Sequence, residues 1–274
     1  MSTIRNAVGL TKLKIKRVLN WPRRSRRFTN RPHDRFWWHG MEQNDYVPAL
    51  YKTLSTREWA IMAAWYDDTA WHGRIGEINV PAMSFMQGLI SGNGVRRTVE
   101  LGSYYGYSTL LTGFMLRSQK NGGHMVSIDL DPVAVEFAQK WINKAGLQKE
   151  VTMHVGDASA QSSLDFAVDK LGGMPELILL DSSHQYSITL KELDLWVDRM
   201  EPGTIMLLHD TSTFARDFDP TDEGGVQRAL DEWLPKHPEV AFLNLNGQVE
   251  PGDDGSKLVY MDGCGLGILQ KLSV

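Results

Sequence analysis

The chain has 274 residues, of which 42% are hydrophobic and 23% are charged, and its formal net charge is -4. These values are ordinary for a folded globular protein, and no apolar run approaches the ~20 residues that cross a bilayer. The single cysteine, Cys264, has no partner for an internal disulfide and no companions for a zinc-binding cysteine cluster. Because the N-terminus also lacks the apolar segment of a secretory signal, we expect a cytoplasmic protein.

The N-terminal segment is strongly basic. Ten Lys and Arg residues and no acid fall between residues 1 and 33, whereas the rest of the chain has an excess of acids. We interpret residues 1–40 as a basic arm, which either folds against an acidic surface of its own body or of a partner subunit in a dimer, or lies on an anionic membrane surface. We expect no nucleic-acid partner, because no recognisable RNA- or DNA-binding module follows.

Two segments with apolar residues at helical spacing come next, at residues 56–72 and 80–91. Pro81 suits the first turn of the second segment, where its missing N–H is not needed. We interpret residues 41–94 as a helical cap and residues 95–274 as the ligand-binding domain.

From residue 97 onward, short β-type runs alternate with longer amphipathic segments. The predicted strands are residues 97–101, 124–128, 150–154, 176–180, 204–208, 240–245 and 265–270, and the predicted helices are residues 106–118, 132–144, 159–171, 186–200 and 224–234. This alternation predicts a doubly wound α/β fold, in which helices cover both faces of a largely parallel, seven-stranded sheet.

An acidic residue ends or closely follows each of the first five predicted strands. These acids are Glu100, Asp129, Asp157, Asp181 and Asp210. In open parallel sheets, ligands bind beyond the carboxyl ends of the strands. Five acids along one rim therefore predict a binding site rather than five unrelated helix caps.

The turn after the first strand narrows the class of ligand. Its sequence is VELGSYYGYS, residues 99–108, with Tyr104 and Tyr107 where a dinucleotide fingerprint needs glycine, and no Gly-Lys-Ser/Thr of a Walker loop follows. An acid, two glycines and a second acid at the next strand end suit a ligand with a ribose and a cationic group but no phosphate. S-adenosylmethionine (SAM) has these features.

The segments VELGSYYGYS and VSIDLDP resemble the first two motifs of class I SAM-dependent methyltransferases, and the tyrosine-containing turn is similar to that of catechol O-methyltransferase-like enzymes. Residues 177–211 resemble small-molecule O-methyltransferases of bacterial secondary and sugar metabolism, a pattern shared by cephalosporin hydroxylase-like proteins. The resemblance covers about residues 95–212. It implies a Rossmann-like fold and methylation of a hydroxyl on a small acceptor, a sugar or phenol of a natural product or glycolipid.

The resemblance also implies roles for individual residues. The cofactor would contact Glu100, Gly102, Ser103, Tyr104, Ser108, Asp129, Asp157, Ala158 and Asp181. Of these, Asp129 would hold the ribose, and Asp157 with Ala158 would lie near the adenine. Asp181 and Asp210 match the acids that bind a divalent cation such as Mg²⁺ in metal-dependent relatives, and the further ligand stays open between His209 and Thr211.

His184 is the predicted catalytic base, acting beside Asp181. It lies three residues after Asp181, where catechol O-methyltransferase-like enzymes place a lysine. An imidazole suits proton removal near neutral pH, since histidine ordinarily has a pKa of about 6.5. A structural role at the start of the next helix is the alternative. Two other functions also stay open: metal-independent O-methylation with a histidine base, and a non-catalytic SAM-binding or membrane-docking accessory protein.

Overall fold

The computed structural model describes residues 47–74, 76–246, 260 and 262–273. The predicted basic arm, residues 1–40, lies outside them, so its contact with a membrane or a second subunit stays a prediction. The chain divides into two compact units, one ending at His72 and one beginning at Gly73. None of the helices in the described ranges is long and apolar enough to cross a membrane.

Between residues 47 and 72, the described part of the first unit, lie the helices α2 (Ala49–Lys52) and α3 (Thr56–Trp71). A capping box begins α3: the Ser55 side chain accepts a hydrogen bond from the Glu58 backbone N–H, and the Glu58 carboxylate accepts one from the Ser55 N–H. This pair satisfies two backbone donors that a helix start otherwise leaves unpaired. The helix predicted over residues 56–72 is therefore confirmed, whereas α2 has no counterpart among the predictions.

The second unit is built on a seven-stranded sheet with the order β3-β2-β1-β4-β5-β7-β6. Its strands are β1 (Arg97–Leu101), β2 (His124–Asp129), β3 (Val151–Val155), β4 (Leu177–Leu180), β5 (Ile205–His209), β6 (Val240–Leu245) and β7 (Leu266–Lys271). The first five strands pair in parallel, and β7 runs antiparallel to both β5 and β6. The predicted seven-stranded α/β fold is confirmed, and each predicted strand matches an observed one to within about one residue at either end.

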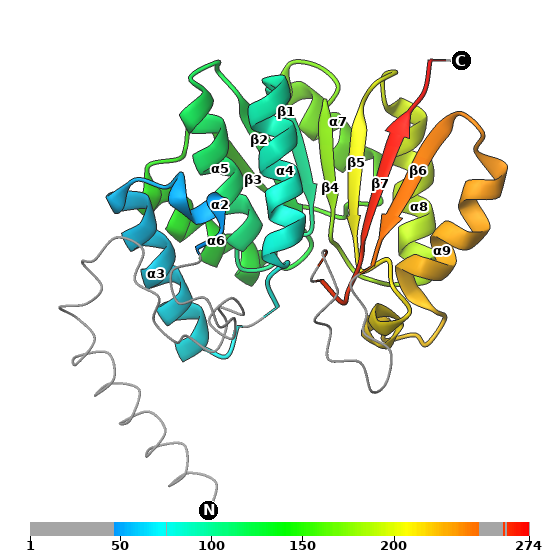
Figure 1. The fold of residues 1–274 in the computed structure, drawn as a ribbon, viewed down its shortest axis with the longest axis horizontal. Coiled ribbons are helices and arrows are strands. Elements are labelled where there is room, and N and C mark those ends of the chain that lie inside the picture. The colour runs from blue at the N-terminus through cyan, green and yellow to red at the C-terminus, as the bar shows by residue number, and fades with distance from the viewer. Residues whose placement is uncertain (1–46, 75, 247–259, 261, 274) are drawn as a thin grey trace, which may run out of the picture. The chain divides into compact units, whose positions relative to one another are not determined.

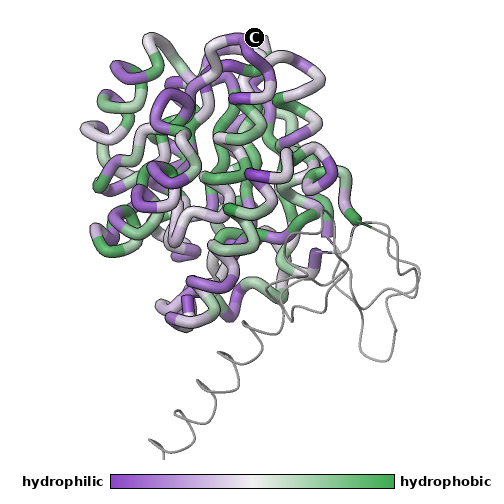
Figure 2. The backbone as a smooth tube through the Cα atoms, turned by 90° about the vertical axis from the view of Figure 1, so that its left-hand side faces the viewer, coloured by the Kyte–Doolittle hydropathy of each residue, from purple (hydrophilic) through white to green (hydrophobic). Residues whose placement is uncertain are grey.

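Helices cover the sheet on both faces (Figure 1). One face carries α4 (Val80–Asn93), α5 (Tyr107–Gln119) and α6 (Pro132–Ala145), and the other carries α7 (Gln161–Leu171), α8 (Tyr186–Arg199) and α9 (Gly225–Trp233), with the short 3₁₀ helices η2 (Phe214–Phe218) and η3 (Leu234–Lys236) flanking α9. Because α4 packs on α5, it belongs with the sheet in the second unit. Figure 2 shows hydrophobic and hydrophilic stretches alternating along the helices, as expected for helices with one buried face.

The core beneath α7, α8 and α9 fixes one of the predicted site loops. Alternate strand residues, including Leu101, Ile178 and Leu208, pack against apolar side chains of these helices. Among them, Trp196 of α8 is fully buried, and its Nε1 donates a hydrogen bond to the carbonyl oxygen of Ala158, 2.9 Å away. The loop after β3 is therefore held by the core through its backbone.

Candidate active site

The five predicted acids lie at the carboxyl ends of β1 to β5. From β1 the chain continues to β2 and β3 on one side, and β4 and β5 lie on the other. The strand order therefore reverses beside β1, and a crevice of this kind is where ligands bind in doubly wound sheets. The site predicted from the sequence is located at this reversal.

The turn after β1 approaches β4 so closely that only glycine fits. Gly102 has φ +92°, and a Cβ placed on it would lie 2.1 Å from the carbonyl oxygen of Asp181. Gly106 also has a positive φ, and its missing side chain leaves room for Ala138 of α6. Tyr104, with φ +44°, projects an exposed side chain from the same turn. The two glycines let the turn pack closely against the Asp181 backbone and against α6.

Asp129 ties the turn to the end of β2. Its Oδ2 accepts hydrogen bonds from the backbone N–H groups of Ser103, at 3.0 Å, and Tyr104, at 2.7 Å. Its Oδ1 accepts one from the Asp131 N–H at 2.9 Å. The predicted ribose acceptor and two predicted cofactor-binding residues of the turn are therefore in direct contact.

Glu100 lies beneath the turn with no exposed surface. It accepts hydrogen bonds from the hydroxyls of Ser108, Thr109 and Ser127. Burial raises the pKa of the Glu100 carboxyl to about 7, although these hydroxyls oppose the shift. Glu100 and Ser108 therefore support the turn from inside the fold, and a direct contact of either with the cofactor stays a prediction.

The loop after β3 carries the next two predicted cofactor residues. Asp157 is exposed at the rim and accepts hydrogen bonds from the N–H and the hydroxyl of Ser159, at 2.8 and 2.7 Å. Ala158 is buried and is held by Trp196. Asp157 thus faces solvent, whereas Ala158 anchors the loop.

The predicted catalytic and metal-binding residues form one cluster at the ends of β4 and β5. His184 Nδ1 lies 3.2 Å from Asp210 Oδ2, and His184 Nε2 lies 3.9 Å from Asp181 Oδ1. His209 Nδ1 lies 3.3 Å from one oxygen each of Asp181 and Asp210. The structure therefore brings together all four residues that the sequence assigned to catalysis and metal binding.

The cluster holds its charges in a buried setting. Burial alone would lower the pKa of His209, but the Asp181 carboxylate, with Asp210 beside it, raises that pKa well above its ordinary value. Burial would likewise raise the pKa of Asp181, but the His209 charge outweighs it and lowers that pKa. The two carboxylates therefore favour the protonated form of the His209 imidazole.

Two residues of this cluster, Asp262 and Cys264, were not predicted. Asp262 is buried, and its Oδ2 lies 3.2 Å from His209 Nε2. Cys264 is half-buried, and burial raises the pKa of its thiol to about 12. In the sequence these residues indicate a turn before the last strand. The pairing of β7 with β5 carries that turn to the carboxyl end of β5, a placement that no local pattern in the sequence reveals.

Within the described ranges, two residue groups have the geometry to hold a cation. They are Asp181 with His184 and Asp210, and His209 with Asp210 and Cys264; the donor atoms within each group lie within 4.8 Å of one another. Asp210 belongs to both groups, and its Oδ1 is buried with no hydrogen-bond donor among the described residues. The hydroxyl of Thr211, the other predicted ligand, donates to Asn244 Oδ1 at 2.7 Å.

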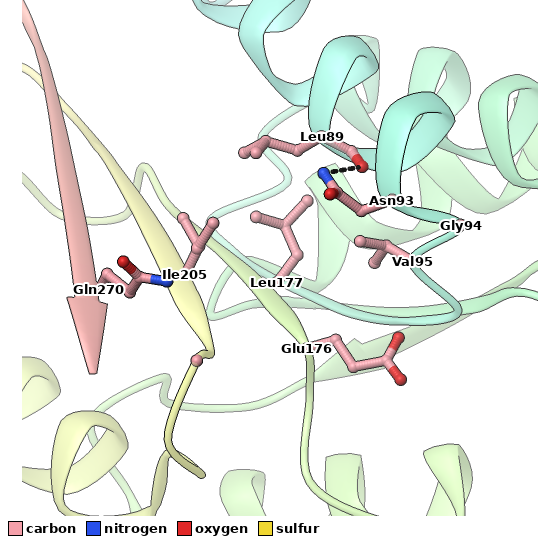
Figure 3. A pocket seen from close by; sticks show the side chains of 9 residues that line it. Leu89, Asn93, Gly94, Val95, Glu176, Leu177, Ile205 and Gln270 are labelled. Atoms are coloured by element: carbon pink, nitrogen blue, oxygen red, sulfur yellow. Dashed lines mark hydrogen bonds between the residues drawn. The ribbon is translucent and has the colours of Figure 1, made fainter. Parts of the chain in front are cut away.

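A separate pocket lies at the opposite ends of β4 and β5 (Figure 3). Its lining is Leu89, Asn93, Gly94, Val95, Glu176, Leu177, Gly203, Ile205 and Gln270. Glu176 accepts hydrogen bonds from the backbone N–H groups of Arg96 and Arg97 and pairs with the Arg97 guanidinium at 3.2 Å. The Glu176 carboxylate in this pocket is therefore paired with groups of the fold itself. None of the predicted site residues lines the pocket.

Comparison with known proteins agrees with this geometry. Residues 99–211 match a family described as a methyltransferase domain. A catechol O-methyltransferase of Niastella koreensis is 27% identical over 57% of this chain and 69% of its own. An Arabidopsis thaliana protein described as a caffeoyl-CoA O-methyltransferase is 30% identical over 71% of this chain and 79% of its own. An O-methyltransferase of Bacillus cereus, solved with SAH, shares the fold at a TM-score of 0.61 and 19% identity, covering 77% of this chain and 90% of that one.

The fold is that of a class I methyltransferase. Within that class, the chain belongs to the SAM-dependent O-methyltransferases of the catechol and caffeoyl-CoA type. The family resemblance stated from VELGSYYGYS is therefore confirmed.

Proposed function

We propose that the protein transfers the methyl group of SAM to a hydroxyl of a small acceptor, a sugar or phenol of a natural product or glycolipid, with a divalent cation at Asp181 and Asp210. One observation carries the proposal: Asp181 and Asp210 end adjacent parallel strands and share the imidazole of His184 between them, at 3.9 and 3.2 Å. A base and two carboxylates at one point, beside the cofactor turn, are what deprotonation and positioning of an acceptor hydroxyl need.

The proposed cofactor residues belong to β1 and the turn after it and to the ends of β2, β3 and β4. We assign the ribose hydroxyls to Asp129, whose carboxylate already accepts hydrogen bonds from the turn. Gly102, Ser103 and Tyr104 would face the methionine end, because they form the turn at the carboxyl end of β1, where ligands bind in sheets of this kind. Asp157 and Ala158 would bound the adenine, and Glu100 with Ser108 would support the turn from below.

The residues at the strand ends fit a divalent cation. Asp210 Oδ1 is a buried oxygen with no donor among the described residues, and Asp181 offers a second carboxylate on the neighbouring strand. Oxygen ligands of this kind suit a hard ion such as Mg²⁺. His209 lies within reach of both carboxylates, as the predicted metal set of Asp181, His209 and Asp210 requires. When bound, the cation would act as a Lewis acid toward the acceptor oxygen.

The side chains then have distinct roles in methyl transfer. His184 is partly exposed, so it can reach an acceptor and take the hydroxyl proton at whichever ring nitrogen faces it. Asp210 Oδ2, which lies 3.2 Å from His184 Nδ1, orients the imidazole and stabilises its protonated form. Alignment of the acceptor oxygen with the sulfonium would supply most of the remaining rate enhancement, since positioning alone can lower the activation barrier by about 7–11 kcal/mol.

Calorimetric titration of the EDTA-stripped protein tests the proposal. S-adenosylhomocysteine should bind to the wild type and to Asp210→Ala, whereas Mg²⁺ should bind only to the wild type. Asp169→Ala is the matched control, because Asp169 is an exposed acid of α7 whose carboxylate pairs with the neighbouring Lys170. If the nucleoside fails to bind the wild type, the cofactor assignment is wrong. If Mg²⁺ binds equally to wild type and Asp210→Ala, the metal assignment is wrong.

A second candidate is metal-independent O-methylation with His184 as the base. The favouring observation is that the His209 imidazole lies 3.3 Å from both Asp181 and Asp210, which favour its protonated form, so its charge would balance them where a cation otherwise would. Chelation separates the two candidates, because methyl transfer that survives EDTA at full rate requires no added ion. A non-catalytic accessory protein would bind the nucleoside but transfer no methyl group to any acceptor.

A further inference from the structure

We propose that His209, Asp210 and Cys264 form a second metal site, which takes a thiophilic divalent ion of the zinc class. The group combines one nitrogen, one oxygen and one sulfur donor, all within 4.8 Å of one another. It shares His209 and Asp210 with the metal set proposed for catalysis and differs from that set in having the thiol of Cys264 in place of the Asp181 carboxylate. The binding itself does not depend on the proposed methyl transfer.

The three donors lie at one end of the paired strands β5 and β7. His209 ends β5, Asp210 follows it, and Cys264 lies in the turn that leads into β7. β7 pairs antiparallel with β5, and His209 is opposite Leu266 in the register. Figure 1 shows β7 running between β5 and β6. A site on paired strands holds its ligands more accurately than a site on free loops.

The imidazole of His209 is oriented in the way that metal-binding histidines are. Its Nε2 lies 3.2 Å from Asp262 Oδ2, and its Nδ1 lies 3.3 Å from one oxygen each of Asp181 and Asp210. An ion bound at Nδ1 would displace the proton that faces these carboxylates, and this proton would leave to solvent. A metal-ligating histidine usually donates its other ring N–H to a carboxylate, and this partner fixes the ring. Asp262 is itself held, by Asn79 Nδ2 at 2.7 Å and by the Cys264 N–H at 3.0 Å.

Asp210 provides an independent sign that a ligand is expected. The residue is 3% exposed, and its Oδ1 has no hydrogen-bond donor among the described residues. This oxygen lies 3.3 Å from His209 Nδ1, on the same side as the proposed ion. A nitrogen and an oxygen bound to one zinc ion, each at about 2.0–2.1 Å, lie at nearly this separation in tetrahedral geometry.

The donor types decide the class of ion. Thiolate and imidazole are the preferred ligands of Zn²⁺ and of its substitute Co²⁺, whereas Mg²⁺ and Ca²⁺ prefer sites made of oxygens alone. A coordinating thiol gives up its proton to solvent when the ion binds. Because Asp210 cannot serve two ions unchanged, we expect zinc at this site to inhibit methyl transfer; this consequence alone rests on the proposed function.

Cobalt binding tests the site with a spectroscopic readout. Co²⁺ added to the metal-free full chain should give the intense near-ultraviolet band of thiolate-to-cobalt charge transfer. The band can come only from Cys264, because the sequence contains one cysteine. Cys264→Ser should abolish the band and weaken zinc binding by at least about tenfold. Asp262→Asn should keep the band but weaken Co²⁺ binding about 10–100-fold, as the loss of an orienting carboxylate does.

Asp181→Asn is the matched control, since Asp181 lies beside His209 but belongs only to the other group. It should weaken Mg²⁺ binding and leave the thiolate band unchanged. Absence of the band in the wild type, or its survival in Cys264→Ser, would overturn the proposal. Loss of S-adenosylhomocysteine binding would count against the proposed function alone, so the two failures are distinguishable.

Discussion

His184 and Asp210 belong to different strand ends, yet the imidazole Nδ1 lies 3.2 Å from the carboxylate Oδ2. Both residues adopt left-handed backbone conformations, with φ +61° and +62°. Each such conformation costs about 1–3 kcal/mol for a residue with a side chain, and these strained positions cluster at active sites. The fold therefore holds this pair at a cost in stability, which points to a functional contact.

Replacement of His184 by alanine tests the base directly. Because a positioned general base contributes about 10²–10⁴-fold, kcat should fall by that factor while S-adenosylhomocysteine affinity is unchanged. Steady-state kinetics with calorimetry measures both. His72→Ala is the control, since His72 is an exposed histidine at the end of α3 in the first unit. A variant with normal kcat would show that His184 is a structural residue of the loop.

The secondary structure could be predicted because its signals are local. The helix α6 begins at Pro132 after the capping Asp131 and ends at Ala145, with Gly146 as its C-cap, and β4 is a run of apolar residues between polar ends. By contrast, α2 has four residues, too few to show a helical period, and η2 lies within a polar loop. Such short elements are set by tertiary packing rather than by a pattern in the sequence.

The candidate site could be predicted only in part. Asp129, Asp181 and Asp210 follow strands that the sequence reveals, so parallel pairing alone brings them to one rim. Asp262 and Cys264 reach the same rim because β7 is inserted between β5 and β6. The order of the strands depends on long-range packing, and no local pattern in a single sequence indicates it. The sequence likewise does not indicate that Glu100 is fully buried, because its burial also depends on long-range packing.

Gly102→Ala should disrupt the site through the backbone. The added Cβ would lie 2.1 Å from the Asp181 carbonyl oxygen, and φ +92° is unfavourable for alanine. We expect the free energy of unfolding to fall by at least about 1–3 kcal/mol, with loss of cofactor binding. Gly88→Ala is the control: Gly88 lies in α4 with nothing near its absent side chain, so alanine should stabilise the protein by roughly 0.5–1 kcal/mol. Urea unfolding of both variants measures these changes. If Gly102→Ala were as stable as the wild type, the close contact between Gly102 and the Asp181 carbonyl would be contradicted.

Asp129→Asn should weaken cofactor binding with little loss of stability. The change removes the charge that accepts hydrogen bonds from Ser103 and Tyr104 and that we assign to the ribose. Hydrogen bonds to charged groups contribute about 1.5–3 kcal/mol, so S-adenosylhomocysteine affinity should fall about 10–150-fold. Asp131→Asn is a control two residues away, because asparagine caps α6 as well as aspartate does. Equal affinities of the two variants in calorimetry would remove Asp129 from the cofactor site.

Two buried carboxyls should make stability fall as pH rises. Burial raises the pKa of Glu100 and of Glu192 from 4.5 to about 7. The folded state therefore binds more protons than the unfolded state between about pH 4.5 and 7, and the stabilisation present below pH 4.5 is lost as pH rises through 7. At 1.36 kcal/mol per pKa unit, each group contributes about 3 kcal/mol to this loss.

The Glu100→Gln, Glu192→Gln double variant should lack this decline, because glutamine mimics the protonated acid at every pH. Urea unfolding at a series of pH values between 4.5 and 8 measures the slope, with Glu201→Gln as a control at an exposed turn position. The control should retain the slope of the wild type. If the double variant declines as steeply as the wild type, the two glutamates are charged in the folded protein and are not the source of the pH dependence.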